Sequence, residues 1–443
     1  MFYDEREHEV DDTELLGDIL PRPHNQRRFR SDQKPFNIDL MLPEAVTSHL
    51  LQALRCDDTV KTPKERATAG TVFANLLLHS NGIFYSRDKN LYASVRRYKP
   101  DHISYLTVTR VVDRLAERNV LCHTRQGRSP NNDWRSHFFA APELRELLEQ
   151  LHKDLAYSSS IREPIILRDE AKRPIGYRDC CATRAARSQV LAFNEFMDDV
   201  NLTVDYPGRR MVGNRILILN DQVFDLRRKS LVRVFNGDLR SNGRFYRAFW
   251  QSLPPAVRAD GLRINGEAVV EVDFTTCHFR ILCGLIGKQL PFSDPQFDPF
   301  AVPYYPRRHI KKSFNILLNT ENKFDAARAL ASDLSEEEGH QHFHSAHYDR
   351  ARCLIETVLG LFPYLDRFWC RLFGLRLMNV DAAICAEVVS VLNADGVPCL
   401  SVHDSFIVPK DQGGLLREVM EHSFKLVVAR AQKVGEAGIK LGL

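Results

Sequence analysis

The sequence predicts an α+β protein with a mostly helical amino-terminal part and a larger mixed part. Apolar residues recur at helical spacing through much of residues 44 to 118, and two short strand-like runs follow. Beyond about residue 160, strand-like runs alternate with long helical ones. At 443 residues, the chain exceeds the usual size of one domain.

The composition is that of an ordinary globular protein, with 27% charged and 44% hydrophobic residues. The net charge is only +4, so a surface for nucleic acid would have to be local. The ten cysteines show no Cys-x-x-Cys pair and no zinc spacing. There is no apolar run of membrane-spanning length and no signal-peptide start, so we expect a cytoplasmic protein without a membrane partner.

Residues 1–43 are polar and charged, and we expect a disordered or extended arm there. In residues 44–153, Thr62 to Glu65 has the pattern of a capping box and opens a helix that runs to His79. Ser104 is expected to cap the next helix. Two short strands, at 120–124 and 137–140, then surround a basic turn.

Helices followed by a basic hairpin are typical of a winged helix, whose recognition helix enters a DNA groove while the wing contacts phosphate. Many winged helices bind only protein, and that alternative stays open. If this domain binds DNA, the contacts are expected from Arg110, Arg114, Arg125 and Arg128.

Two apolar, strand-like runs in the second part carry an aspartate each, namely Val270 to Phe274 with Asp273 and Leu400 to Val408 with Asp404. A carboxylate in an apolar strand is costly to desolvate, so a fold that has two of them usually binds a cation there. In a two-metal site such carboxylates hold ions about 4 Å apart. Taken alone, Asp273 could simply end a strand and Asp404 could simply lie in a turn.

Between these runs, residues 307–319 have the pattern of an amphipathic helix that starts after Pro306. Its polar face and its apolar face are separated by helical spacing. The polar face consists of Arg308, Lys311, Asn315 and Asn319, and the apolar face of Ile310, Phe314, Leu317 and Leu318. A basic stripe of this kind suits a triphosphate, although it is also typical of a solvated face.

The run from Asp273 to Leu285 resembles motif A of the family A DNA polymerases, with Asp273, Phe274 and Arg280 at the family's positions. The run Val402 to Pro409 resembles motif C, and its His-Asp-Ser-Phe sequence is closest to the phage-type single-subunit RNA polymerases. The basic helix resembles motif B, the fingers helix. The resemblance covers only the part after about residue 160.

The resemblance implies a right-hand polymerase in residues 160–443, with a palm at 220–288 and 379–443, fingers at 289–378, and a reduced thumb. It implies that Asp273 and Asp404 bind two Mg²⁺ ions, or Mn²⁺ in their place. Arg307 and Lys311 would hold the incoming nucleotide, together with Asn315 and Asn319 on the same helix. Lys311 could also act as a general acid toward pyrophosphate.

Two positions depart from the family pattern. Asn319 stands where both polymerase groups have a tyrosine, and His278 stands where the DNA polymerases have a glutamate that excludes the ribose 2′-hydroxyl. An imidazole can obstruct a 2′-hydroxyl but can also form a hydrogen bond with one. Both dNTP and NTP therefore remain candidate substrates.

Further residues are candidates for nucleic-acid contacts. The run Gly237 to Tyr246 resembles a segment that helps to hold template and hybrid in phage-type RNA polymerases, and it contains Arg240 and Arg244. A glycine-containing turn with surface arginines is an equal alternative. Asn379, near the start of an apolar helix at 378–392, and His403, in the motif C turn, are the other candidates.

The histidines between His340 and His347 suggest a metal, but no second ligand cluster accompanies them, and we expect an exposed loop. The sequence as a whole predicts a template-directed nucleotidyltransferase, either a polymerase or a primase-like enzyme, in the replication of a mobile element or plasmid. Its partners would be a DNA template and dNTP or NTP, with an RNA primer or product also open. The alternative is a DNA-binding replication initiator or transcriptional regulator with an inactive polymerase fold.

Overall fold

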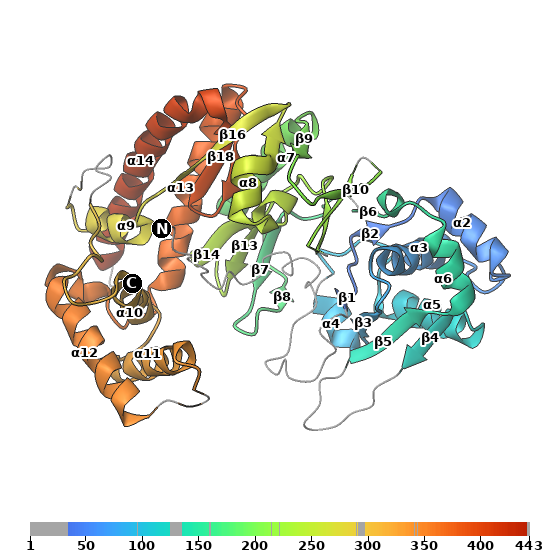
Figure 1. Ribbon diagram of the computed structural model, residues 1–443, viewed down its shortest axis with the longest axis horizontal. Coiled ribbons are helices and arrows are strands. Elements are labelled where there is room, and N and C mark those ends of the chain that lie inside the picture. The colour runs from blue at the N-terminus through green and yellow to red at the C-terminus, as the bar shows by residue number, and fades with distance from the viewer. Residues whose placement is uncertain are drawn as a thin grey trace. The chain divides into compact units, whose positions relative to one another are not determined.

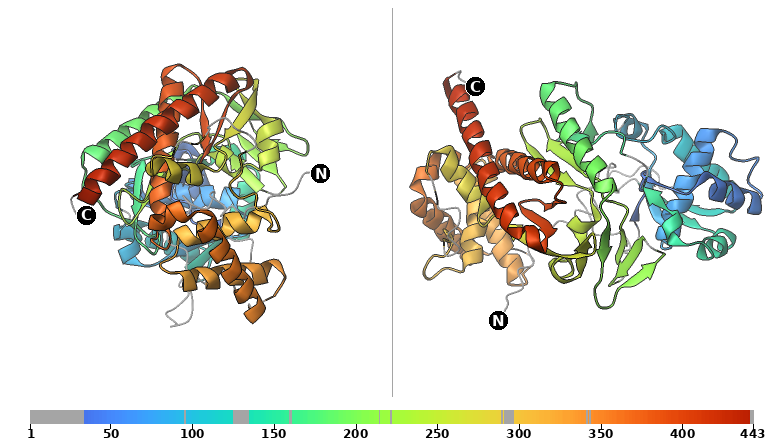
Figure 2. Two further views of the ribbon diagram at one scale, coloured as in Figure 1. Left: turned by 90° about the vertical axis from the view of Figure 1, so that its left-hand side faces the viewer. Right: turned by 90° about the horizontal axis from the view of Figure 1, so that it is seen from above.

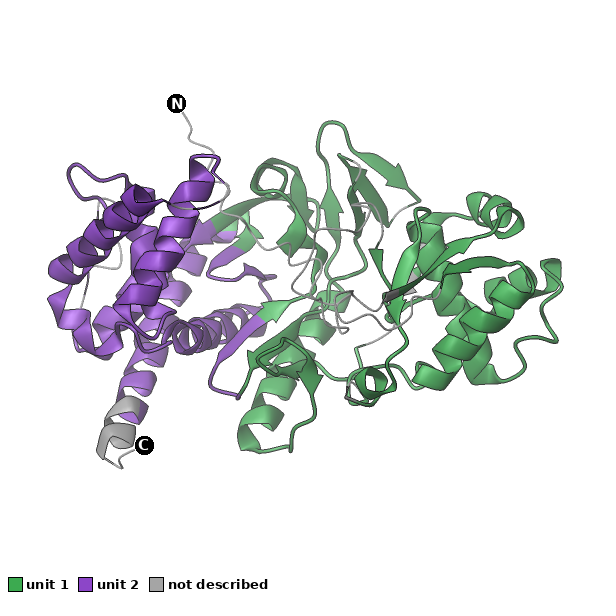
Figure 3. Ribbon diagram, turned by 90° about the horizontal axis from the view of Figure 1, so that it is seen from below, with its two compact units in different colours: residues 1–237, 245–271, 407–411 green, residues 238–244, 272–406, 412–443 purple. Residues whose placement is uncertain are grey.

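The computed structural model describes residues 34–440 except 95, 125–134, 159–160, 214, 221, 289, 291–296, 341 and 343. The protein is mixed α+β with several small sheets (Figure 1). Its chain divides into two compact units (Figure 3). Unit 1 comprises Met1–Gly237, Phe245–Glu271 and Ile407–Asp411, and unit 2 comprises Asp238–Arg244, Val272–Phe406 and Gln412–Leu443. Compact units are not necessarily folding domains, so the domain limits expected from the sequence stay predictions.

The first part of unit 1 contains a group of helices and a four-stranded sheet of order β1-β3-β5-β4. The helices are α2 (Glu44–Ala53), α3 (Pro63–Leu78), α4 (Lys89–Ser94), α5 (Tyr105–Glu117) and α6 (Pro142–Glu149). The strands are β1 (Lys34–Pro35), β3 (Ile83–Ser86), β4 (Leu121–Thr124) and β5 (Arg135–Ala140). Strands β4 and β5 pair antiparallel, which confirms the predicted hairpin to within two residues at each end.

Capping explains where two of these helices begin. The Thr62 hydroxyl accepts the Glu65 N–H, and the Glu65 carboxylate accepts the Thr62 N–H, so both unpaired donors are satisfied. Helix α3 starts at Pro63 and has His79 as its C-cap, as predicted. Ser104 caps α5 in the same way, and the apolar stripe that includes Val108 and Leu115 is fully buried.

The packed part of the chain begins earlier than the boundary at residue 43 that the sequence predicts. Residues 1–33 lie outside the described residues, but Phe36, Ile38, Leu40 and Leu42 are all buried. These alternate side chains point into the core of unit 1, as expected for an extended segment with one buried face. The prediction of a disordered or extended arm is therefore wrong for residues 34–43.

The rest of unit 1 contains the α-helices α7 (Cys181–Asp198) and α8 (Pro255–Gly261) and shorter strands, one of which, β14 (Asn242–Tyr246), begins in unit 2. A meander has the order β10-β11-β12, a second sheet has the order β14-β13-β7-β8, and β2 pairs with β6. These strands are β2 (Leu40–Met41), β6 (Tyr157–Ser158), β7 (Ile165–Arg168), β8 (Pro174–Ile175), β10 (Arg210–Val212), β11 (Ile216–Leu219), β12 (Gln222–Asp225), β13 (Val232–Asn236) and β14 (Asn242–Tyr246).

A five-stranded sheet of order β17-β18-β16-β15-β9 carries both aspartates of interest. Its strands are β9 (Leu202–Val204), β15 (Leu262–Ile264), β16 (Glu267–Asp273), β17 (Leu400–Val402) and β18 (Ser405–Pro409). Strand β15 pairs antiparallel with both β9 and β16. Strands β16 and β18 are neighbours in the sheet although they lie more than 100 residues apart in the sequence.

Unit 2 is mainly helical (Figures 1 and 2). Its helices are α9 (Cys277–Leu285), α10 (Arg307–Leu318), α11 (Lys323–Glu337), α12 (Ser345–Leu361), η3 (Pro363–Phe368), α13 (Gly374–Ala394) and α14 (Gly413–Lys440). The helices α10, α11 and α12 pack on one another, and α9, α13 and α14 do the same. Within the part of the chain that the structure describes, no helix is long and apolar enough to cross a membrane.

The histidine-rich stretch is not simply the exposed loop that the sequence predicts. His340 and His344 are exposed, but Ser345 begins α12, and His347 is buried on that helix. The expectation of an exposed loop is therefore wrong for His347.

Candidate functional site

Asp273 and Asp404 start from neighbouring strand ends in the five-stranded sheet. Asp273 is the last residue of β16, and Asp404 directly precedes β18, the strand beside it. The Phe274 N–H donates to the carbonyl oxygen of Asp404 at 3.1 Å, which joins the two segments just beyond the strands. The Asp273 residue is exposed and Asp404 is half-buried.

The turns that present these aspartates have unusual backbone conformations. Thr276 and His403 both have φ of 57°, in the left-handed region that residues other than glycine rarely adopt. Such residues persist only where the surrounding structure holds them. Here the Phe274 ring packs against Phe406 and Phe424, each with a centroid separation of 5.9 Å.

Arg280, which the sequence resemblance assigns to the motif A arginine, contacts other parts of unit 2. Its side chain is buried, and its Nε donates to the Thr275 carbonyl at 2.9 Å. Its guanidinium also lies 5.4 Å from the centre of the Phe297 ring. Arg280 therefore fixes the turn that follows Asp273.

A third carboxylate, Asp381 on α13, was not predicted from the sequence. It is 2% exposed, and it accepts hydrogen bonds from Arg244 Nε at 2.9 Å and Arg244 Nη2 at 2.5 Å. His278 Nε2 lies 3.7 Å from the same carboxylate oxygen, which is longer than a hydrogen bond. The sequence prediction chose Asn379 on this helix, although an acid within an apolar helical run is itself a signal for a buried partner.

The three aspartates are close enough for their charges to affect the pKa of the same group, the Cys277 thiol. Burial raises the pKa of the Cys277 thiol well above its ordinary value, and the charges of Asp381, Asp404 and Asp273 add to this effect. Burial also raises the pKa of Asp404, and the Asp381 charge raises it further. For Asp381 itself, burial acts to raise the pKa, but Arg244 and then His278 lower it to about 2.

Asp273 and Asp404 are suited to hold a divalent cation. Carboxylate oxygens are the preferred ligands of Mg²⁺, and a cation would offset the cost that raises the pKa of Asp404. Asp381 is already paired with Arg244. Among the described residues, the three aspartates do not form a group whose ligand atoms all lie within 4.8 Å of one another. We therefore do not count Asp381 among the candidate ligands.

Helix α10 forms as predicted, with Pro306 as its N-cap. Ile310, Phe314, Leu317 and Leu318 are at most 1% exposed, which confirms the apolar face. The Phe314 ring packs 5.9 Å from Phe279 of α9 and 5.2 Å from Trp369. An aromatic core thus holds the basic helix against the helix that follows Asp273.

The polar face of α10 faces solvent in part and α11 in part. Arg308 Nη2 and Lys312 Nζ lie 3.4 Å and 3.5 Å from the carboxylate of Glu337. Arg307 forms an ion pair with Asp298. Lys311 is half-buried and Asn315 is exposed.

At the end of the same helix, Asn319 is also exposed. Its Nδ2 donates to the Asn315 carbonyl at 2.8 Å. Asn319 therefore continues the polar face along which Asn315 lies, as predicted.

Three of the candidates for nucleic-acid contact in unit 2, namely Arg240, Arg244 and Asn379, belong to residues 238–244 or contact them. Arg240 is exposed, whereas Arg244 forms an ion pair with Asp381. Asn379 Nδ2 donates to the Asn242 carbonyl at 2.9 Å and so ties α13 to this turn. His403 lies in the turn between β17 and β18.

In unit 1, Arg110 Nη1 and Arg114 Nη1 lie 3.3 Å and 3.1 Å from the buried Glu65 carboxylate. They come from α5, and Glu65 belongs to the first turn of α3, so these arginines tie the two helices together. Arg125 and Arg128 lie outside the described residues.

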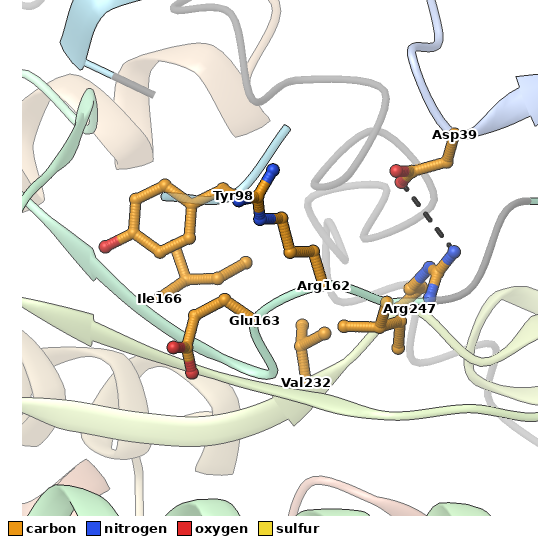
Figure 4. Close-up of a pocket in the computed structure, with 8 residues that line it drawn as sticks. Asp39, Tyr98, Arg162, Glu163, Ile166, Val232 and Arg247 are labelled. Carbon is orange, nitrogen blue, oxygen red and sulfur yellow. Dashed lines mark ion pairs between the residues drawn. The ribbon is translucent and has the colours of Figure 1, made fainter. Parts of the chain in front are cut away.

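One pocket in unit 1 has none of these candidates among its lining residues (Figure 4). It is lined by Asp39, Tyr98, Arg162, Glu163 and Arg247 among others, and Arg247 Nη2 is 3.7 Å from Asp39 Oδ2. Its volume of about 10 Å³ is room for about one water molecule, so it is too small for a nucleotide.

No protein-family model matches this chain, and no curated protein matches it either.

Proposed function

We propose that the protein is a template-directed nucleotidyltransferase, a DNA or RNA polymerase or a primase-like enzyme. In this proposal residues 160–443 supply a palm and fingers with a reduced thumb, and residues 44–153 are a winged-helix-like module that contacts the template. The substrates would be a DNA template and dNTP or NTP.

One observation carries the proposal. Asp273 and Asp404 extend from adjacent strand ends that are joined by the hydrogen bond from Phe274 to Asp404. The basic helix α10 packs through Phe314 on the helix that begins just after Asp273. Phosphoryl transfer depends on the positioning of the reactants and on the stabilisation of negative charge. Carboxylates that can hold metal ions and a basic helix that can hold phosphates would supply both.

In the proposed enzyme, Asp273 and Asp404 hold two Mg²⁺ ions, with Mn²⁺ as an alternative. When bound, such ions stabilise the charge on the attacking and leaving oxygens. Asp381 and Arg244 hold the surrounding structure, because their charges are already paired with each other.

The nucleotide would bind along α10, with its phosphates at Arg307 and Lys311. Arg307 would exchange its present partner Asp298 for phosphate oxygens. Lys311 would stabilise the leaving pyrophosphate as a cation or as a proton donor. His278, five residues after Asp273, is the candidate for contact with the sugar.

The proposal is tested by nucleotide incorporation. Purified protein is incubated with a primed or an unprimed single-stranded DNA template, Mg²⁺ or Mn²⁺, and labelled dNTPs or NTPs in separate reactions. We expect product in at least one combination, and none when the ions are removed by a chelator. Product from the unprimed template with NTPs would identify a primase or RNA polymerase.

Asp404→Asn keeps the shape of the side chain and removes the charge, so product formation should fall by at least about a hundredfold, which corresponds to about 3 kcal/mol of lost metal-assisted stabilisation. The matched control is Asp395→Asn, which makes the same change at an exposed residue after α13 and should leave the rate unchanged. Absence of product in every combination, or product unaffected by Asp404→Asn, would contradict the proposal.

The second candidate function is a DNA-binding replication initiator or transcriptional regulator with an inactive polymerase fold. Asn319, at the position of the motif B tyrosine, favours it. Template binding without incorporation, unchanged by Asp404→Asn, would support this second function.

A further inference from the structure

Three potential metal ligands meet where α11 ends and α12 begins. Glu338 is the C-cap of α11, His340 follows two residues later, and His347 lies in the first turn of α12. Ligand atoms of Glu338, His340 and His347 all lie within 4.8 Å of one another. The sequence prediction missed this group because it considered the histidines without the glutamate before them.

The two imidazole rings of this group lie close together. The ring centroids of His340 and His347 are separated by 5.4 Å. With a metal–nitrogen distance of about 2.1 Å and tetrahedral angles, the rings of two ligating imidazoles lie about 5 Å apart. A movement of well under 1 Å would therefore bring these two rings to the separation that one ion requires.

The carboxylate of Glu338 is oriented for a role beside these rings. Its Oε2 lies 2.9 Å from His347 Nε2, and its Oε1 accepts a hydrogen bond from Arg350 Nη1 at 2.8 Å. A hydrogen-bonded partner of this kind fixes the direction of a ligating carboxylate. Because Arg350 holds Oε1, the oxygen that faces His347, Oε2, is the candidate ligand atom.

His347 sets the condition for binding. Its Nδ1 accepts the backbone N–H of His344 at 3.0 Å, so the neutral ring carries its proton on Nε2, directed at Glu338. An ion bound at Nε2 takes the place of that proton, which moves to Nδ1, and the capping hydrogen bond to His344 breaks. The change costs two hydrogen bonds, the one that caps α12 and the one between His347 and Glu338, and it releases no net proton from His347.

We propose that Glu338, His340 and His347 form a binding site for one Zn²⁺ ion or a similar transition-metal ion. Two imidazoles and one carboxylate match the ligand types that Zn²⁺ prefers, whereas Mg²⁺ prefers a set of oxygens. The site is chemically different from the aspartate pair, and its function does not depend on the polymerase reaction. Because its ligands come from both sides of the α11–α12 junction, a bound ion fixes that junction.

The test is metal binding to the full chain after chelator treatment. Co²⁺ is titrated in excess Mg²⁺, which occupies the aspartate pair, and visible absorption reports tetrahedral coordination. Zn²⁺ is then added in competition. We expect one ion per chain and a rise in the melting temperature, both unchanged in Asp404→Asn.

Exposed ligands make the best test variants, because their loss does not empty the core. His340→Ala and Glu338→Gln should each weaken binding by at least about tenfold. His342→Ala is the matched control, since His342 is exposed in the same stretch and lies outside the cluster, and it should leave the affinity unchanged. Absence of saturable binding in excess Mg²⁺ would overturn the proposal. It would also be overturned if His342→Ala weakened binding as much as His340→Ala.

Discussion

At the scale of single residues, the pair of Asp381 and Arg244 best illustrates what holds the site. The two residues are 137 positions apart in the sequence, and Asp381 is almost completely buried. Burying either charge alone would be costly, so each residue requires the other. The pairing could not be predicted from the sequence, because no local sequence pattern connects a glycine-containing turn with an acidic residue in a distant helix.

Asp381→Asn should destabilise the fold. The amide keeps the shape but leaves the Arg244 charge without its counter-charge, and the free energy of unfolding should fall by about 3 kcal/mol. Asp238→Asn removes the exposed ion pair with Arg376 and should cost about 1 kcal/mol or less. Denaturant unfolding of both variants measures the difference, and equal effects would contradict the role given to Asp381.

The same residue predicts a pH dependence. Its pKa in the folded state, about 2, is below the ordinary value of 3.8, so its ionised form stabilises the fold. This contribution is fully present above about pH 4 and is lost as the pH falls toward about 2. Between these limits the wild type should therefore lose more stability than Asp381→Asn. Parallel acid-induced losses in both proteins would argue against the shift.

At the scale of elements, local signals in the sequence predicted where helices such as α3 and α10 begin. Pro306 and the apolar spacing after it placed α10, and the Thr62 to Glu65 pattern placed the start of α3. These features act within one or two helical turns, so they can be recognised in the sequence. The ion-pair partners of the polar side chains could not be predicted in this way, because Arg307 meets Asp298 and Arg110 meets Glu65 only through tertiary packing.

The paired aspartates show the same limit in another form. Their strand-like runs identified Asp273 and Asp404 as candidates, but the hydrogen bond that joins the two turns depends on how the sheet is ordered. The histidine cluster needed Glu338 from the preceding helix and was missed.

Phe314 should be critical for keeping α10 on α9. Phe314→Ala removes a fully buried ring that contacts Phe279, Phe300 and Trp369, and it should lower the free energy of unfolding by about 3 to 5 kcal/mol. Phe324→Ala, at a residue that is 59% exposed on α11, should cost about 0.5 kcal/mol. Chemical denaturation compares the two, and a small effect at Phe314 would show that α10 is held by other contacts.

At the scale of the whole molecule, the chain has two compact units, and the candidate catalytic residues Asp273, Asp404 and Lys311 all belong to unit 2. The helices and basic hairpin proposed to contact the template belong to unit 1. This division predicts that catalysis and template binding can be separated by mutation. Asp404→Asn should abolish incorporation and leave the affinity for single-stranded DNA unchanged, as measured by fluorescence anisotropy. A matching loss of DNA affinity would show that the carboxylate acts in binding.

The most direct test of the central claim is whether the template chooses the nucleotide. A set of primed templates that differ only in the first unpaired base is supplied with one labelled nucleotide at a time, in Mg²⁺. The wild type should add only the complementary nucleotide to each template, and Asp404→Asn should add none. Addition that ignores the template base, or equal addition by Asp404→Asn, would contradict a template-directed enzyme built on Asp273 and Asp404.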